Sequence, residues 1–462
     1  MPGEGEILKL KRTVVAAIAL AMLAAGCAGR STSDQEAEPH AAEPGNFGDL
    51  SSICHEGATT SAPTRGVTAT EIKVGVFSDI GFTKQSEFVD AAEVFTSWCN
   101  AAGGINGRKI VAEVRDTNLM EVRQRMLDAC REDFVLVGGG AALDGLGVKD
   151  RLSCLLPEFP AQVSQAQNLQ SDLQITALAG TYAHYEPYFG FRSWLLREAY
   201  PESAGAVGII TGDSPVTKVL SDKAAEAIRA AGGTVTYSDL YPATGVSDWT
   251  PYAQAIKNKG VKGLVFYGDY RQLAKLEDVL TSIDYKLDWV DPTNNSYNSQ
   301  FLEAAAQSIQ KQNNVIDLSG AVPIEAVEAS PAMKQMHDIY TKYAPDAELT
   351  LNSVRAFSAW LLFAKAATSC GDQLTRRCVV EAAGKESGWS GGGLHTARDL
   401  SDKDAAPQCF NVVQATPSGW KQADFKPDQG LFRCNIALYR YIGNYGSPTT
   451  LADVGKSFND VE

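Results

Sequence analysis

The spacing of apolar residues alternates between two periods along the chain after residue 66. Residues 71–77, EIKVGVF, have the pattern of a largely buried strand. Residues 86–104 instead repeat apolar side chains every three or four positions, which predicts a helix ending at Gly103–Gly104. The same alternation predicts a strand, a helix and a strand over 106–116, 120–130 and 133–140. Because strands and helices alternate, we expect a parallel sheet with right-handed crossovers.

The pattern is repeated in the second half of the chain. Strands are predicted at 204–213, 234–241 and 261–269, and helices at 217–233, 248–260 and 272–283. The expected fold class is therefore α/β, with two Rossmann-like lobes of parallel sheet around a central ligand cleft. In such open sheets ligands bind at the carboxyl ends of the strands.

A different hydrophobic pattern marks the N-terminus. The apolar run Thr13–Ala25 follows Lys9, Lys11 and Arg12, and small residues precede Cys27. The run is too short to span a bilayer, and the arrangement resembles a bacterial lipoprotein signal. We expect a signal peptide over 1–26, a lipid on Cys27 and a flexible tether to residue 66, which places the protein on the extracytoplasmic face of the cell membrane. The alternative is an ordinary secretory signal with a chance cysteine.

Net charge, sequence motifs and cysteine content further limit the classes of function that the chain can have. The formal net charge of −14 argues against a nucleic-acid partner. The sequence has no His-Glu-x-x-His, Walker or Cys-x-x-Cys motif. We therefore expect no enzymatic activity, no cofactor and no metal site. Eight cysteines besides Cys27 suggest disulfides, although the sequence alone allows many pairings.

Several segments together resemble a known family. NAAGGINGRKI (100–110) follows IKVGVFSD (72–79) and precedes FVLVGGGAALDG (134–145). With LVFYGDYRQLAKLEDVLTS (264–282) and LNSVRAFSAWLLFAKAA (351–367), they resemble type 1 periplasmic binding proteins, in particular the branch that binds branched-chain amino acids and amides for ABC importers. Where that family often has Thr-Gly-Pro after the first strand, this chain has SDIGFTKQ, which leaves the ligand class open.

The resemblance implies that the ligand is held by loops at the strand ends. Tyr182 and Tyr185 are expected to begin a helix of the second lobe, and Tyr267 to close over a small ligand. For each polar candidate the alternative is an ordinary turn residue. The expected ligand-binding residues are Ser78, Asp79, Gly139, Gly140, Ala141, Ser164, Gln165, Tyr182, Tyr267, Asp269 and Asn294, with Tyr185, Asn295 and Tyr297 as further candidates.

The fold also suggests domain limits and disulfides. We expect lobe 1 at 67–178 and 319–390, and lobe 2 at 179–318, with a return segment of lobe 2 and a C-terminal tail over 391–462. Two bridges are suggested by local turns and two by the expected placement of helix ends on the first sheet. The expected pairs are Cys54–Cys99, Cys130–Cys154, Cys370–Cys378 and Cys409–Cys434.

These expectations combine into one hypothesis and two alternatives. The chain is predicted to be a monomeric lipoprotein that captures a small organic ligand (an amino acid, an amide, or an aromatic or apolar acid) and delivers it to the permease of an ABC importer. The first alternative is a ligand-sensing lipoprotein without a transport role. The second is a cell-envelope hydrolase, which would need a nucleophile or metal constellation.

Overall fold

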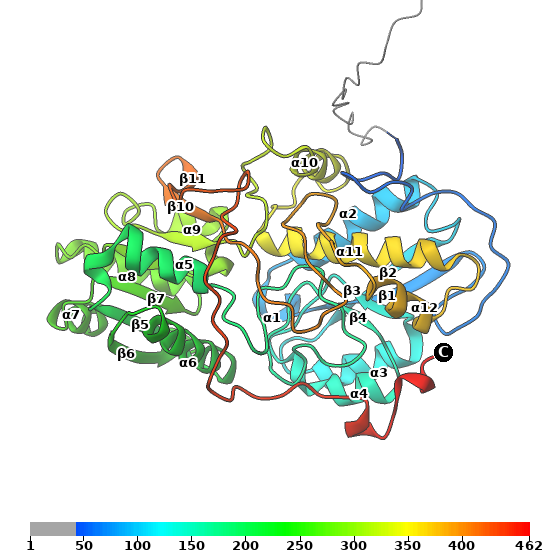
Figure 1. Cartoon of the computed structure of the whole chain (residues 1–462), viewed down its shortest axis with the longest axis horizontal. Helices are drawn as coiled ribbons and strands as arrows, with labels where there is room; N and C mark the ends of the chain where they lie inside the picture. Colours follow the sequence, from blue (N-terminus) through cyan, green and yellow to red (C-terminus); the bar gives the residue numbers. More distant parts are fainter. Residues whose placement is uncertain (1–42) are drawn as a thin grey trace, which may run out of the picture. The chain divides into compact units, whose positions relative to one another are not determined.

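Two parallel sheets organise residues 43–462, which the computed structural model describes (Figure 1). The first sheet has the strand order β2-β1-β3-β4 and the second β6-β5-β7-β8, with every named pairing in both sheets parallel. The predicted α/β fold with two lobes of parallel sheet is thus confirmed. We call the part built on the first sheet lobe 1 and the part built on the second sheet lobe 2.

Lobe 1 begins with the predicted strand–helix–strand unit. In α2 the side chains of Phe88, Ala91, Phe95 and Cys99 are buried, as the helical spacing predicts. The elements of this part are β1 (Glu71–Ser78), α1 (Ile80–Thr83), α2 (Glu87–Ala101), β2 (Lys109–Asp116), α3 (Val122–Glu132), β3 (Val135–Val137), α4 (Val148–Ser153) and β4 (Glu158–Phe159).

A later part of the chain completes lobe 1. Helices α10 (Pro331–Tyr343) and α11 (Leu351–Cys370) pack on α2, and α12 (Arg376–Ala383) packs on α11. Most of α11 is buried all round, because it lies between α2, α12 and the strands β3 and β4. A Thr350–Ser353 capping box fixes its start, beside which Arg355 enters the interior.

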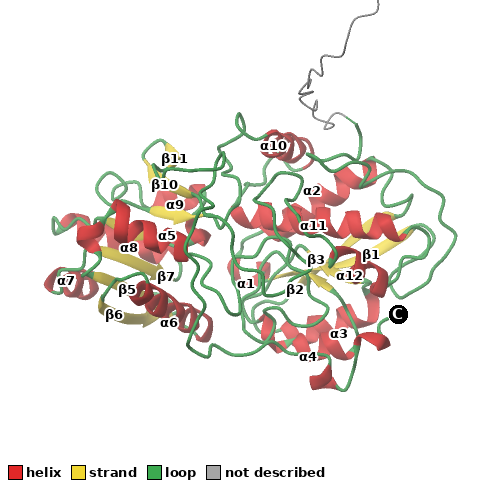
Figure 2. Ribbon diagram, viewed as in Figure 1, coloured by secondary structure: helices red, strands yellow, loops and turns green. Residues whose placement is uncertain are grey.

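Lobe 2 repeats the same arrangement, and Figure 2 shows helices flanking the strands of each sheet. Ser214 caps α6 with a side-chain hydrogen bond, and Asp269 caps α8 in the same way. The elements are α5 (Phe189–Trp194), β5 (Val207–Asp213), α6 (Pro215–Ala230), β6 (Val235–Pro242), α7 (Thr250–Asn258), β7 (Gly263–Tyr267), α8 (Tyr270–Ser282), β8 (Trp289–Asp291) and α9 (Ser299–Ala304).

A small antiparallel sheet, β11-β10-β9, adjoins lobe 2. It consists of β9 (Val315–Asp317), β10 (Val412–Thr416) and β11 (Gly419–Gln422), and a parallel bridge from Val290 to Asn314 links it to β8. The chain therefore returns to lobe 2 after α12. Short 3₁₀ or π turns occupy 144–146, 195–199, 201–203, 294–296, 452–454 and 458–460.

One helix start differs from the sequence prediction. Helix α5 begins at Phe189, and neither Tyr182 nor Tyr185 belongs to it. The backbone before Phe189 has other partners, because Tyr185 forms a bridge with Arg440 and the Glu186 N–H donates to the Tyr439 carbonyl. Long-range pairing thus replaces the first helical turn that the aromatic spacing suggested.

The structure contains the four expected disulfides. The Cα–Cα distances are 5.3 Å for Cys54–Cys99, 5.8 Å for Cys130–Cys154, 6.0 Å for Cys370–Cys378 and 4.0 Å for Cys409–Cys434. The predicted signal peptide and the lipidation site Cys27 lie outside the described residues.

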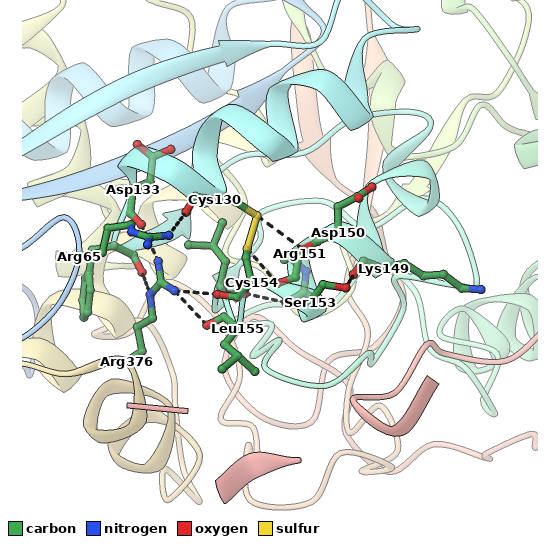
Figure 3. Close-up of a disulfide and its surroundings, with 12 residues drawn as sticks. Arg65, Cys130, Asp133, Lys149, Asp150, Arg151, Ser153, Cys154, Leu155 and Arg376 are labelled. Atoms are coloured by element: carbon green, nitrogen blue, oxygen red, sulfur yellow. Dashed lines mark hydrogen bonds between the residues drawn. A yellow bond between two sulfur atoms is a disulfide. The ribbon is translucent and has the colours of Figure 1, made fainter. Parts of the chain in front are cut away.

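The Cys130–Cys154 bridge joins α3 to the residue that follows α4, and Arg65 and Arg376 lie beside it (Figure 3). Arg376 of α12 donates from Nη1 to the Cys154 carbonyl at 2.9 Å and from Nη2 to the Asp133 carbonyl at 2.8 Å. Arg65 donates to the Cys130 carbonyl at 2.6 Å. The disulfide and the two guanidinium groups thus tie α3, α4 and α12 together next to the amino end of β3.

Candidate functional site

A cavity of about 320 Å³ is lined by residues of both lobes at the carboxyl ends of their strands. Lobe 1 contributes the loop after β4 and one turn of α11. Lobe 2 contributes the start of α5, one face of α6 and the ends of β7, β8 and β9. The polar or aromatic lining includes Gln162, Ser164, Thr181, Tyr182, Glu186, Tyr188, Arg192, Lys223, Tyr267, Asp291, Asn294, Asp317, Arg355 and Tyr441.

On the lobe 2 side of the cavity, a buried arginine holds a network of charges. Arg192, only 2% exposed, donates from Nη2 to the Tyr267 hydroxyl at 3.0 Å and from Nε to Glu186 Oε1 at 3.4 Å. Its Nη1 lies 3.6 Å from Asp291 Oδ2. Burial alone lowers the pKa of Arg192, but Tyr267, Glu186 and Asp291 outweigh it and the net shift is upward. Glu186 and Asp291 are therefore already paired with a cation.

On the lobe 1 side, Arg355 is attracted electrostatically to Tyr188 and Asp317, but its hydrogen bonding is incomplete. It is 6% exposed, and its Nε and Nη2 atoms have no hydrogen-bond partner among residues 43–462. Burial lowers the pKa of this guanidinium, although the side chain remains a cation at neutral pH. A buried guanidinium with two unused donors is costly, and an acceptor entering the cavity would satisfy them.

Asp317 brings a second incompletely bonded group to the cavity. Its Oδ1 accepts from the Ser319 N–H at 2.8 Å, whereas Oδ2 has no partner among the described residues. Burial raises the pKa of Asp317 to about 8, so the carboxyl group is largely protonated at neutral pH. In that form the group can donate a hydrogen bond.

Lys223 of α6 is the third buried cation in the lining. Its Nζ donates to the Tyr182 carbonyl at 3.2 Å and lies 4.9 Å from the centre of the Tyr441 ring. Burial lowers its pKa, which Glu186 partly offsets. Tyrosine rings and Lys223 thus supply both an aromatic surface and positive potential to the same cavity.

Four of the expected ligand-binding residues line the cavity. They are Ser164, Tyr182, Tyr267 and Asn294, and the further candidate Asn295 lies with them. Asn294 donates from Nδ2 to the Tyr188 hydroxyl at 2.9 Å, and that hydroxyl donates to the Gly180 carbonyl at 3.1 Å. The structure thus brings strand ends from both lobes together as the parallel fold requires.

The other expected residues lie outside this lining and have local partners. Asp79 accepts hydrogen bonds from the backbone N–H groups of Ala142, at 2.7 Å, and Leu119, at 3.0 Å, and from the Thr117 hydroxyl. Gln165 accepts from the Gly145 N–H at 3.0 Å. The residues outside the lining are Ser78, Asp79, Gly139, Gly140, Ala141, Gln165, Asp269, Tyr185 and Tyr297.

Most of the charged lining residues were not anticipated from the sequence. Asp291 and Asp317 end the strands WVD and VID, so the strand-end rule could have found them. Arg192 and Arg355 carried another signal, since each is the one charged residue in a mostly apolar stretch of helix, FGFRSW and LNSVRAFSAWLL. Tyr441 lies in a C-terminal segment that neither ends a strand nor places a single charged residue in an apolar helix.

Residues 43–462 contain no group of three His, Cys, Asp or Glu side chains that could hold a metal ion. Within the same range, none of the helices has the length and apolarity needed to cross a membrane.

Comparison with known proteins gives one family and a consistent fold. A sequence family described as "Periplasmic binding protein" matches residues 189–421. No curated protein matches the chain.

Many solved structures share the fold at low sequence identity. A fatty acid ABC transporter substrate-binding protein from Thermomonospora curvata is 18% identical, with a TM-score of 0.66, over 84% of this chain and 97% of that chain. A leucine-binding protein from Thermotoga maritima is 12% identical, with a TM-score of 0.62, over 76% and 97%. A branched-chain amino acid transporter substrate-binding protein from Streptococcus pneumoniae, in complex with isoleucine, is 14% identical, with a TM-score of 0.59, over 77% and 100%.

Proposed function

The chain belongs to the periplasmic binding protein family, and from that premise we propose that it is a membrane-anchored, extracytoplasmic solute-binding protein that captures a small organic acid between its lobes and delivers it to an ABC importer. The observation that carries this proposal is the pair of unused donors on the buried Arg355, opposite the polar strand ends of lobe 2. A carboxylate can accept two parallel, charge-assisted hydrogen bonds from a guanidinium group.

The remaining charges favour an acid without an ammonium group. Glu186 and Asp291 are paired with Arg192, and burial keeps Asp317 largely protonated near neutral pH. An ammonium group entering the cavity would therefore lack a free carboxylate partner, and burying it unpaired would be costly. The tyrosine rings of the lining suit an apolar or aromatic body attached to the acid.

Binding to matched pairs of compounds tests the proposed ligand class. Titration calorimetry would compare octanoate with octanamide, benzoate with benzamide, and isoleucine as an acid that carries an ammonium group. Loss of one charge-assisted hydrogen-bonded contact should weaken binding about tenfold or more, so each amide should bind much less tightly than its acid. If isoleucine binds most tightly, or an amide equals its acid, the proposed class is wrong.

The membrane anchor rests on the sequence around Cys27 and has its own test. Cys27→Ala should release an otherwise folded protein from the membrane or leave its signal peptide uncut. Membrane fractionation and intact mass measurement would show either result. A variant that is processed and membrane-bound like the parent protein would contradict the anchor without affecting the ligand site.

A further inference from the structure

The chain continues beyond the part that matches the family, whose match ends at residue 421. After the Cys409–Cys434 disulfide it leaves lobe 2 and runs to lobe 1, as the red segment of Figure 1 shows. We call residues 435–448 the strap and residues 449–462 the foot.

The strap is held on lobe 2 by one carboxylate of α6. Glu226 Oε1 accepts from the Tyr439 hydroxyl at 2.9 Å and from the Ile442 N–H at 2.6 Å. Its Oε2 accepts from the Gly443 N–H at 3.1 Å and from the Tyr445 hydroxyl. Four donors from seven consecutive residues thus converge on a single side chain, which fixes the path of the strap over the helix.

Between these contacts the strap enters the ligand cavity. The Tyr441 side chain is part of the lining, and its hydroxyl donates to Glu186 Oε2 at 2.7 Å. The Tyr441 N–H also donates to the His184 carbonyl at 2.8 Å. Since the other oxygen of Glu186 accepts from Arg192, Tyr441 positions the charge network of lobe 2 as well as forming one wall.

The foot is anchored on lobe 1. The Thr449 N–H donates to the Gln167 carbonyl at 2.9 Å, and the Leu451 N–H to Asp172 Oδ2 at 2.8 Å. Arg377 of α12 donates from Nη2 to the Phe458 carbonyl at 3.1 Å and from Nε to the Val461 carbonyl at 3.0 Å. The side chains of Leu451 and Val461 are buried in a small cluster with Val148, Leu152 and Leu173.

We propose that the strap and foot form a latch that governs ligand release: Tyr441 completes the cavity, and the foot makes the strap an additional connection between the lobes. Any movement that separates the lobes must then stretch the strap or detach the foot. Because the latch acts on a bound ligand, its effect falls on the dissociation rate. This inference rests on the proposed function for its role in release, although the latch itself can be tested without a ligand.

The first experiment measures hydrogen–deuterium exchange by mass spectrometry on the unliganded full chain. A chain ending at Pro448 removes the whole foot, and Arg377→Ala removes the hydrogen bonds from α12 to its last residues. Both should raise amide exchange in the strap and over residues 184–192, and leave α7 and β6 unchanged. Arg131→Ala, which removes only an exposed ion pair with Asp128, is the control. Unchanged exchange in the strap for both foot variants would overturn the latch.

The second experiment measures release of octanoate by stopped-flow displacement. Tyr441→Phe removes only the hydroxyl that bonds to Glu186, and we expect dissociation about tenfold faster at a similar association rate. Tyr237→Phe, which removes an exposed hydroxyl contact to Asp239, should leave both rates unchanged. Equal dissociation rates for Tyr441→Phe and the parent protein would contradict the role of Tyr441. If octanoate fails to bind the parent protein, the proposed ligand class fails, and the exchange result alone decides whether the latch exists.

Discussion

The two lobes have nearly the same strand–helix order, yet they use their strand ends differently. In lobe 1 the carboxylates at these ends point into their own loops. Asp79 bonds to backbone N–H groups of two neighbouring loops, and Asp144 accepts from the N–H groups of Ser164 and Gln165, each at 2.9 Å. In lobe 2 the corresponding groups, Asp291 and Tyr267, face the cavity and share Arg192. A place at a strand end thus brings a side chain near the cleft, but its local partners decide whether it is available to a ligand.

The largest predicted effect comes from breaking the charge network of lobe 2. Arg192→Ala leaves Glu186 and Asp291 buried without their cation, and the free energy of unfolding should fall by about 3–5 kcal/mol. Arg271→Ala removes an exposed ion pair with Asp269 in the same lobe and should cost less than about 1 kcal/mol. Denaturant unfolding followed by circular dichroism measures both. Similar losses for the two variants would show that the network is not the feature that sets lobe 2 apart.

A smaller effect is predicted at the strand end of lobe 1. Asp79→Ala removes an acceptor shared by three donors, so stability should fall by about 1–3 kcal/mol. Ligand affinity of the folded variant should change little, whereas Tyr267→Ala should weaken binding clearly. Calorimetry with octanoate, carried out well below the unfolding temperature, measures the affinity of each folded variant and so separates a loss of stability from a loss of binding. A strong affinity loss in Asp79→Ala would instead make Asp79 part of the ligand site, as its sequence position suggested.

A pH effect should distinguish Asp317 from carboxylates at the surface. Burial raises its pKa in the folded protein to about 8, from a value near 4 in the unfolded chain. The folded state therefore binds more protons than the unfolded state between about pH 4 and pH 8, and the contribution of Asp317 to stability is lost as pH rises through that range. Asp317→Asn should flatten this decline, while Ser319→Ala, a neighbouring change that does not titrate, should leave it in place. An unchanged pH profile in Asp317→Asn would contradict the buried, protonated carboxyl.

Much of the fold followed from local patterns. The apolar runs predicted three of the four strands in each parallel sheet, β1 to β3 and β5 to β7, and the helices α2, α3, α6, α7 and α8, all within a few residues. The start of α5 was wrong because the backbone around Tyr185 and Glu186 pairs with residues 439 and 440, far away in the sequence. The spacing of apolar residues within a segment cannot predict a hydrogen-bond partner that lies far away in the sequence.

The candidate site was less predictable than the fold for the same reason. Ser164, Tyr182, Tyr267 and Asn294 were expected because strand-end loops meet in a parallel fold. Arg355 and Tyr441 reach the cavity from a core helix and from a returning C-terminal segment, so their role depends on three-dimensional contacts. A single charged residue in the mostly apolar first half of α11 is the sequence signal that could have drawn attention to Arg355.

Binding of the ligand's acidic group by Arg355 can be tested in a single set of calorimetric titrations. Whichever of octanoate and benzoate binds the parent protein more tightly would be titrated alongside its amide. The same two titrations would be repeated with Arg355→Gln and with the surface control Arg271→Gln. Since glutamine keeps hydrogen-bonding capacity but removes the charge, the preference for the acid should fall about tenfold or more, and the amide should bind as before. If Arg355→Gln keeps the full preference for the acid over the amide, Arg355 does not bind the carboxylate and the account is wrong.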